Sequence, residues 1–309
     1  MAEPRAGFVA LLGPPNVGKS SLLNALLGER LAIVSPRPQT TRSRILGILP
    51  RGDAQILFLD TPGRHRGRRP LNVALNAVVD EATRHCDVAC LLVDATRGWS
   101  ETHEELLAAL GGPSAKLIVV RTKCDRLGRS RRRRGRMERA PDAASETMRR
   151  PEPIPETLAA RAVDVSSRSG AGLEALLDAI VARLPVSPPL YDDESLTDRP
   201  LRWLCAELIR EAAMGLLDEE LPHSIAVEIH AFDESDPRLV RIRADVLVER
   251  ASQKGIVVGQ GGRQIKQIGM RARRAIESLV GSKVHLELFV KVDPRWSKSP
   301  ERMAELGYH

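Results

Sequence analysis

A glycine-bounded loop between an apolar run and a leucine-rich segment constrains this chain more than any other stretch. The loop reads Gly13-Pro14-Pro15-Asn16-Val17-Gly18-Lys19-Ser20-Ser21, and it joins the apolar residues 8–12 to residues 19–27, whose leucines recur at helical spacing. A strand, a Gly-x4-Gly-Lys-Ser loop and a helix in this order are typical of a phosphate-binding P-loop. Such a loop turns its backbone N–H groups onto a triphosphate, and the dipole of the following helix points at the same anion. The stretch therefore predicts a nucleotide site.

Each residue type in this loop has a physical role in holding phosphate. Gly13 and Gly18 let the backbone turn inward, Lys19 is placed to reach the β- and γ-phosphates, and Ser20 can offer its hydroxyl to Mg²⁺. We assign nucleotide contacts to seven residues of the loop: Gly13, Asn16, Val17, Gly18, Lys19, Ser20 and Ser21.

Short apolar runs alternate with helix-patterned segments up to about residue 184. Strands are predicted over residues 8–12, 45–49, 55–59, 88–93, 117–120 and 162–165, and helices over residues 19–27, 71–84, 101–110 and 172–184. This alternation predicts an α/β domain with a mainly parallel sheet covered on both faces. Because ligands bind beyond the carboxyl ends of the strands in such sheets, we expect the loops at those ends to carry the chemistry.

Two of those loops predict a metal and phosphate site. Asp60-Thr61-Pro62-Gly63 follows the third strand, where Asp60 can hold Mg²⁺ through water and Gly63 leaves room for its N–H to meet a γ-phosphate. The proline-containing stretch 36–42 has no helical period, so we expect a loop in which Thr40 or Thr41 gives the metal a second hydroxyl. A loop held only by metal and γ-phosphate orders with the triphosphate and loosens after hydrolysis.

Two further loops predict the choice of base. In Thr122-Lys123-Cys124-Asp125 the carboxylate can accept the two N–H groups on guanine's Watson–Crick edge, while the lysine stem lies along the purine face. Adenine presents an acceptor and no amino group at that edge, so Asp125 favours guanine. Ser166 and Ser167, after the sixth strand, can place backbone N–H groups near the guanine oxygen.

In this order the motifs resemble those of the translation-factor-type GTPases. The resemblance implies that the ligand is GTP with Mg²⁺ and that the reaction is GTP hydrolysis. It implies a catalytic set of Lys19, Thr41, Asp60 and Gly63, with Ser20, Thr41 and Asp60 at the metal.

The chain departs from the family pattern at three positions. Thr122 stands where the family has an asparagine that braces the base pocket, so we expect weaker but still guanine-selective binding. Ser167 replaces an alanine, and Arg64 stands where Ras-like GTPases carry a water-orienting glutamine, so intrinsic hydrolysis should be slow. Relatives without that glutamine can use a potassium ion held by the P-loop asparagine; Asn16 either has this role or only shapes the loop.

Length and composition narrow the class of protein. With 309 residues the chain is expected to form two domains, and a formal charge of +7 favours an anionic partner, nucleic acid before a membrane surface. The four cysteines form no Cys-x-x-Cys pair, so we expect buried or half-buried thiols. No apolar run is long enough to span a bilayer and no signal pattern opens the chain, so we expect a cytoplasmic protein.

A second domain follows a proline-rich and then acidic hinge at residues 185–194. A helix is predicted over residues 201–214, strands over 224–229 and 240–248, a long helix over 263–279 and a strand over 284–292. Between the last two helices lies the turn Gly259-Gln260-Gly261-Gly262, and residues 251–276 hold six basic side chains and no acidic one. The α-β-β-α-α-β pattern with this turn resembles a KH domain of the prokaryotic type (type II), which implies contact with RNA.

Glycines at the turn let the backbone come close to a nucleic-acid backbone. We expect RNA contacts from Lys254, Gly259, Gln260, Gly261, Gly262, Arg263 and Lys266, over a groove floor made by Ile256, Val257, Ile265 and Ile268. The alternative is a glycine-relieved helix–turn–helix with a solvated basic face.

Taken together, the motifs are similar to those of the Era-type GTPases over nearly the whole chain. The stretches that carry the similarity are the P-loop, Gln39-Thr40-Thr41-Arg42, Asp60–Gly63, the Gly259–Gly262 turn, residues 284–292 and Leu306-Gly307-Tyr308. The resemblance implies a GTPase domain at 1–185, a linker at 186–200 and a KH domain at 201–309. An arginine-rich insertion with Arg129–Arg136 lies outside the similarity, and we interpret it as a solvated basic loop.

The resemblance also implies a function and a place in the cell. That family binds the 3′ end of the small-subunit (16S) ribosomal RNA, assists maturation of the small ribosomal subunit through the pre-30S particle, and associates with the inner face of the bacterial membrane. We expect a monomer whose RNA binding is coupled to the nucleotide state. Two alternatives stay open: a membrane-surface signalling GTPase, and an RNA clamp with little turnover.

Overall fold

The computed structural model describes residues 3–35, 40–64, 70–127, 152–160, 162–217, 221 and 224–308. By their internal contacts the residues form two compact units. Unit 1 comprises residues 1–32, 45–64 and 79–197, and unit 2 comprises residues 33–44, 65–78 and 198–309. The expected domain boundaries at 185 and 201 remain predictions, because the two units are not continuous in sequence.

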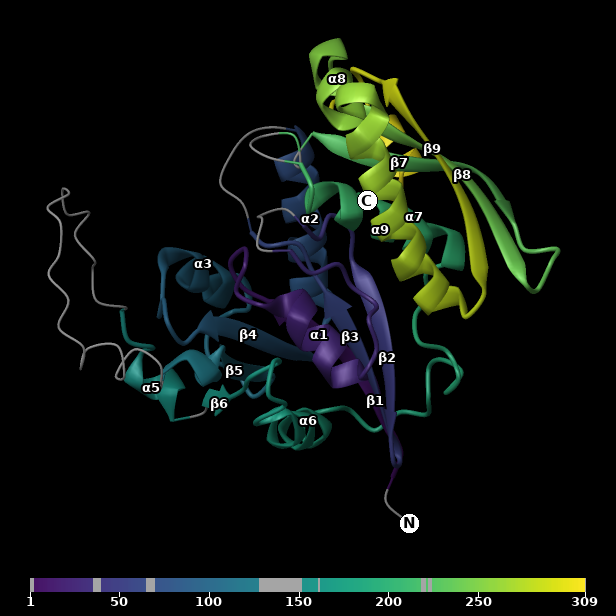
Figure 1. Ribbon diagram of the computed structural model, residues 1–309. Helices are drawn as coiled ribbons and strands as arrows, with labels where there is room; N and C mark the ends of the chain where they lie inside the picture. The colour runs from purple at the N-terminus through teal and green to yellow at the C-terminus, as the bar shows by residue number, and fades with distance from the viewer. Residues whose placement is uncertain are drawn as a thin grey trace, which may run out of the picture. The chain divides into compact units, whose positions relative to one another are not determined.

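Unit 1 is built on a six-stranded sheet in the order β2-β3-β1-β4-β5-β6 (Figure 1). Its strands are β1 (Arg5–Leu12), β2 (Ile45–Arg51), β3 (Ala54–Asp60), β4 (Val88–Asp94), β5 (Leu117–Thr122) and β6 (Ala162–Asp164). All pairings are parallel except that of β2 with β3, which is antiparallel because only Gly52 and Asp53 separate the two strands. The prediction of a mainly parallel α/β sheet is confirmed.

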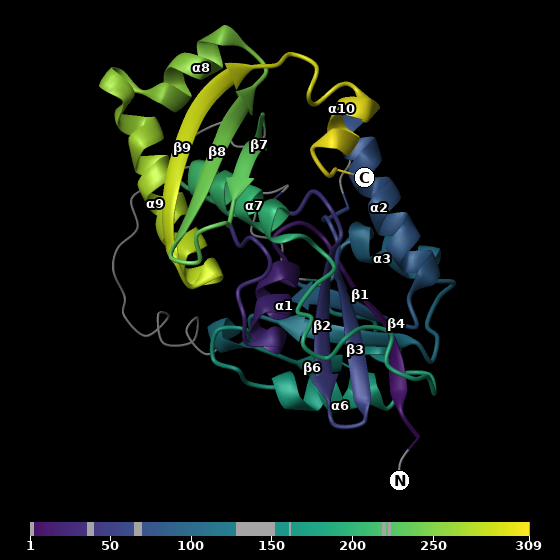
Figure 2. The same ribbon diagram turned by 90° about the vertical axis from the view of Figure 1, so that its right-hand side faces the viewer.

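Helices cover both faces of this sheet, with α1 and α6 on one side and α3 on the other (Figure 2). The helical elements of unit 1 are α1 (Lys19–Leu27), the second half of α2 (Pro70–His85), α3 (Glu101–Ala109), the short turn η1 (Cys124–Arg126), α5 (Glu156–Ala159) and α6 (Leu173–Val181). The strands β3 and β4 are buried along their whole length on both faces, which explains their continuous apolar runs. Cys86, Cys90 and Cys205 are buried free thiols and Cys124 is half-buried, as expected.

Unit 2 carries a three-stranded sheet in the order β7-β8-β9, with β7 antiparallel and β9 parallel to the central strand. Its elements are α7 (Leu201–Met214), β7 (Ile225–Asp233), β8 (Leu239–Val248), α8 (Ala251–Val258), the turn η3 (Gln260–Gly262), α9 (Arg263–Val280), β9 (Lys283–Val292) and α10 (Pro300–Glu305). Apolar side chains of α7, α8 and α9 pack on one face of the sheet, where Ile268, Ala272 and Ile276 form the buried stripe of α9. The prediction of a KH domain is confirmed in its order of helices and strands.

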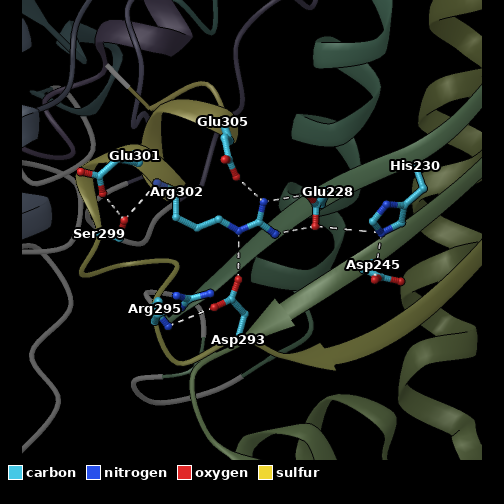
Figure 3. Close-up of polar contacts among 9 residues, drawn as sticks. All are labelled: Glu228, His230, Asp245, Asp293, Arg295, Ser299, Glu301, Arg302 and Glu305. Carbon is cyan, nitrogen blue, oxygen red and sulfur yellow. Dashed lines mark hydrogen bonds and ion pairs between the residues drawn. The ribbon is translucent and has the colours of Figure 1, made fainter.

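The opposite face of this sheet is covered near Ala226 and Leu247 by the C-terminal segment, including α10, which the sequence did not predict. Arg302 of α10 binds the Glu228 carboxylate through both terminal guanidinium nitrogens (2.9 and 2.6 Å) and donates from Nε to Asp293 (3.0 Å) (Figure 3). These carboxylates raise the pKa of Arg302. The bidentate pair with Glu228 fixes the orientation of α10 on the sheet.

None of the helices in the described ranges is long and apolar enough to cross a bilayer.

Candidate functional sites

The P-loop, α1 and the end of β3 bring three predicted residues together in unit 1. The Ser20 hydroxyl donates to Asp60 Oδ2 (2.7 Å), so two oxygens meet where the sequence predicted a magnesium site. Lys19 Nζ is buried and donates to the carbonyls of Gly13 and Pro14, at 3.0 Å each. Burial lowers the pKa of Lys19 to about 8, with Asp60 acting in the opposite direction. A triphosphate is the kind of partner that would restore the positive charge of this ammonium.

Two glycines of this site lie where no side chain fits. A Cβ on Gly63 would come within 2.7 Å of the Pro15 backbone nitrogen, and one on Gly13 within 2.9 Å of the Leu92 carbonyl oxygen. Gly18 has φ of 108°, in the left-handed region, at the start of α1. Val17 is buried in the loop, and Ser21 lies half-buried in the first turn of α1. Because Gly63 has no side chain, its backbone N–H can come close to a phosphate bound in the P-loop.

The predicted base loops also meet in unit 1. The Ser166 hydroxyl donates to Asp125 Oδ1 (2.8 Å), which fixes the carboxylate that is predicted to read guanine. Ser167 follows, half-buried. The Thr122 hydroxyl donates to the Val17 carbonyl in the P-loop (2.7 Å), so this threonine does brace the loop. A hydroxyl has one hydrogen, and the Val93 carbonyl, at 3.4 Å, is a poor second acceptor.

Lys123 and Asn16 are the non-glycine residues with positive φ, each at 61°, within the part of the chain that the structure describes. Lys123 Nζ donates to the Asn16 carbonyl (2.7 Å) and to Asp94 Oδ2 (2.6 Å). Asparagine tolerates the left-handed region, but lysine rarely adopts it without a constraint. The two bonds of Lys123 supply that constraint and tie the base loop to the P-loop. Asp94 was missed in the sequence, because it lies in no motif that we recognised.

Arg64, which stands in the place of the water-orienting glutamine, is engaged by two helices of unit 1. Its Nη1 donates to Asp80 of α2 (2.8 Å), and its Nε lies 3.6 Å from Glu105 of α3. Arginine has no acceptor atom and cannot orient water as a base does. The slow hydrolysis expected from this position stays a prediction.

Thr40 and Thr41 lie in a segment that belongs to unit 2. Arg210 of α7, itself paired with Glu207, donates to the Thr40 carbonyl (2.5 Å). The neighbouring Arg42 is buried, donates to the Ile225 carbonyl (2.5 Å), and lies over the Trp296 and Tyr308 rings at 5.3 and 5.7 Å. The structure therefore groups Thr40 and Thr41 with the KH unit, and their predicted role at the metal remains a prediction. Gln39 and the arginine run 129–136 lie outside the described residues.

The turn between α8 and α9 has the backbone that its glycines predict. Gly259, Gly261 and Gly262 have φ of 70°, 59° and 75°. The predicted RNA-contacting side chains of Lys254, Gln260, Arg263 and Lys266 are exposed around this turn. The start of α9 and the exposed basic side chains form a surface suited to phosphates.

A groove of about 370 Å³ lies between α9 and β9, beside this turn. Its lining residues are Ile265, Lys266, Gly269, Met270, Arg273, Val284, His285, Leu286 and Leu288. The predicted floor was wrong for Val257 and Ile268, which are fully buried in the core of unit 2. Ile265 does line the groove, whereas Ile256 is exposed and is not part of its lining. The strand β9, which we had not assigned to the groove, supplies the other wall.

Comparisons with known proteins agree with both units. The profile of the family described as 50S ribosome-binding GTPase matches residues 8–123, and that of the KH domain matches residues 220–297. GTPase Era of Mycobacterium sp. (strain KMS) is 41% identical over 100% of both chains.

Two solved structures match the chain at 35% identity with TM-scores of 0.84. One is Era in complex with MgGDPNP and nucleotides 1506–1542 of 16S ribosomal RNA, with 99% of each chain covered. The other is a single-residue variant of Aquifex aeolicus Era bound to GDP·AlF4⁻, with 98% of this chain and 99% of that chain covered. With this similarity over its whole length, the chain belongs to the Era family of GTPases.

Proposed function

We propose that the chain binds GTP with Mg²⁺ in unit 1, hydrolyses GTP slowly, and binds the 3′ end of small-subunit ribosomal RNA through the KH unit to assist maturation of that subunit. The observation that carries the proposal is the convergence of the phosphate, metal and base loops in one unit of a chain whose other unit has the Gly259–Gly262 turn beside a basic groove. The complex of a related Era with MgGDPNP and 16S ribosomal RNA supports the same pairing of ligands.

The residues of unit 1 fit a magnesium-bound nucleotide. Ser20 and Asp60 would hold the metal, Ser20 directly and Asp60 through water, and Thr41 would add a ligand when its segment is at the site. Lys19 and the P-loop amides would hold the phosphates, and Asp125, Lys123 and the Ser166 loop the guanine. When bound, the metal neutralises charge that develops on the phosphate oxygens. Gly63 would place its N–H at the γ-phosphate.

The KH unit would bind single-stranded RNA at the turn and in the groove. Lys254, Arg263 and Lys266 are exposed cations for the backbone phosphates, and the apolar walls can contact bases. Thr40 and Thr41 are predicted to contact the nucleotide, but they belong to the unit that would bind RNA. We therefore infer that RNA binding depends on the nucleotide state. Such coupling is reciprocal: if GTP tightens RNA binding, RNA tightens GTP binding by the same factor.

The test is a multiple-turnover GTPase assay combined with RNA binding. We expect the wild-type protein to hydrolyse GTP and not ATP, and to bind an RNA of the 16S 3′ end with an affinity that changes between GDP and a GTP analogue. Lys19→Ala should abolish nucleotide binding and leave RNA binding in place, whereas Gly262→Asp should do the reverse. Equal binding of ATP and GTP, or no RNA binding in any nucleotide state, would contradict the proposal.

Arg64 favours a second candidate, an RNA clamp with little turnover. Its pairing with Asp80 and Glu105 leaves no water-orienting group at that position. A turnover rate indistinguishable from the buffer background, with RNA binding intact, would favour the clamp. Comparing turnover in potassium and sodium buffers tests whether Asn16 supports hydrolysis through potassium; equal rates would exclude that role.

We propose a cytoplasmic location with peripheral contact on the inner face of the membrane. The formal charge of +7 supports attraction to anionic lipid. Flotation with anionic vesicles, with and without competing RNA, separates this contact from RNA binding and tests the alternative of a membrane-surface signalling GTPase.

A further inference from the structure

His103 lies in the first turn of α3, buried with 1% of its surface exposed, and none of the sequence motifs includes it. The backbone N–H of Ser100 donates to His103 Nδ1 (3.0 Å), and His103 Nε2 lies 3.0 Å from the Leu92 carbonyl oxygen. Since a carbonyl can only accept, Nε2 carries the hydrogen, and Nδ1 must be the acceptor. The contacts therefore define a single neutral tautomer that joins the start of α3 to β4.

The Leu92 carbonyl is at a critical place in the sheet. The strand β4 lies between β1 and β5. The backbone N–H of Ala89 donates to Lys116, on the side of β5. Backbone groups of successive strand residues point alternately to the two neighbouring strands, so the carbonyl of Leu92, three residues further on, points to the side of β1. There, however, β1 ends at Leu12 and the chain leaves the sheet to form the P-loop. A Cβ on Gly13 would lie 2.9 Å from this carbonyl oxygen, so the first P-loop glycine packs directly against it.

We propose that His103 is a positioning residue of the nucleotide site: by holding the Leu92 carbonyl, it fixes the wall against which Gly13 enters the P-loop. The inference rests on the proposed function, since it assigns an effect on nucleotide binding. His103 itself touches neither phosphate nor base.

Histidine suits this position because its two ring nitrogens can serve two partners at once: Nδ1 accepts from Ser100, and Nε2 donates to Leu92. A glutamate at the third helical position completes a cap with its carboxylate but has no hydrogen for the Leu92 carbonyl. The His103 ring is stacked on Trp99 (centroids 4.9 Å apart, planes at 22°), and the Trp99 indole nitrogen donates to Glu104. The stack prevents the ring from turning away from Leu92.

Two charged groups, Glu104 and Lys19, influence the protonation of the His103 ring. Burial lowers the pKa of His103 and Lys19 adds to the effect, while the hydrogen bonds to Leu92 and Ser100 and the charge of Glu104 oppose it. The Ser100 hydroxyl also lies 2.7 Å from Nδ1 and donates to it in the neutral state. Protonation would place a hydrogen on Nδ1, so the Ser100 N–H would lose its acceptor, the hydroxyl would have to accept instead of donate, and a positive charge would appear near Lys19. Acidification should therefore weaken the contacts of His103 with Ser100.

The experiment measures GDP affinity in Mg²⁺ by isothermal titration for wild type, His103→Phe, His103→Gln and His85→Gln. His103→Phe keeps a ring without either hydrogen bond, so we expect affinity to fall about fivefold or more, since it leaves a buried carbonyl unpaired. His103→Gln retains a donor and an acceptor and should restore affinity to within about twofold of wild type. His85 is exposed at the end of α2 and serves as the matched control, without effect.

A pH series gives a readout that a purely structural role would not move. Because the pKa of His103 is lowered, the GDP affinity of wild type and His85→Gln should fall only when the pH drops below the ordinary histidine range, and this fall should be absent in His103→Gln. A lower melting temperature of His103→Phe with unchanged GDP affinity would overturn the inference, and so would identical pH profiles of wild type and His103→Gln. Failure of the wild type to bind GDP at any pH would instead contradict the proposed function.

Discussion

Gly269 offers a test in which stability and RNA binding change in opposite directions. It lies in the middle of α9 and lines the groove between α9 and β9. A Cβ on Gly269 would meet only Leu288 Cδ1, at 3.6 Å, which is ordinary van der Waals contact. The fold thus has room for alanine, and the absence of a side chain leaves the helix backbone open to whatever occupies the groove.

Both magnitudes can be worked from this geometry. Alanine is more favourable than glycine in a helix interior by roughly 0.5–1 kcal/mol, which corresponds to a rise in melting temperature of about 1–4 °C for a unit of this size. An added methyl on a surface in close contact costs about 1–3 kcal/mol. We therefore expect Gly269→Ala to weaken RNA binding about tenfold while it stabilises the KH unit.

The assay combines thermal melting with fluorescence anisotropy of a labelled RNA of the 16S 3′ end. Gly255→Ala is the matched control, because Gly255 also lies within a helix, α8, but its added Cβ would point into open space and it does not line the groove. The control should gain stability and keep its RNA affinity. An unchanged RNA affinity of Gly269→Ala would refute the reasoning, and a lower melting temperature would show that the glycine serves the fold instead.

Three further predictions concern other contacts. Thr122→Asn supplies two N–H donors where the hydroxyl supplies one to Val17, so GDP affinity should rise about two- to fivefold, and Thr122→Val should lower it by a similar factor; titration calorimetry measures both. The pKa of Lys19 is about 8, and bound phosphate favours its charged form, so GTP affinity should fall as pH rises from 8 to 10. Binding should then take up a proton, which calorimetry detects as a binding heat that depends on the ionisation enthalpy of the buffer. Arg302→Met removes the bidentate pair with Glu228 and should lower the free energy of unfolding by about 1–3 kcal/mol in urea; a change below about 0.5 kcal/mol would mean that the pair is fully offset by hydration.

The sequence was enough to predict those contacts that follow from the order of strands, loops and helices along the chain. The P-loop and Asp60 could be paired in advance because parallel strands end at one edge of a sheet, and the structure joins Ser20 to Asp60 at 2.7 Å. The bracing role of Thr122 also followed from its place in the motif.

Other features depend on side-chain direction or on distant pairing and could not be read from motifs. Val257 and Ile268 were assigned to the groove because they are apolar and near the turn, although the spacing of Ile268, Ala272 and Ile276 marks the core face of α9. The groove wall from β9 depends on its parallel pairing with β8, which no local pattern specifies. His103 could not be assigned to the site from the sequence, because its role depends on its contact with the Leu92 carbonyl in strand β4.

The composition of unit 2 from three separate stretches of chain has a consequence for synthesis on the ribosome. Residues 33–44 and 65–78 emerge early, but Ile225, Trp296 and Tyr308, which enclose Arg42, are made later. Tyr308 follows Val78 by 230 residues (308 − 78), a delay of roughly 10–50 s at bacterial elongation rates of about 5–20 residues per second. During that interval the nascent chain presents Leu71, Leu75 and Arg42 without their final neighbours, so these residues depend on transient protection until Tyr308 has been made.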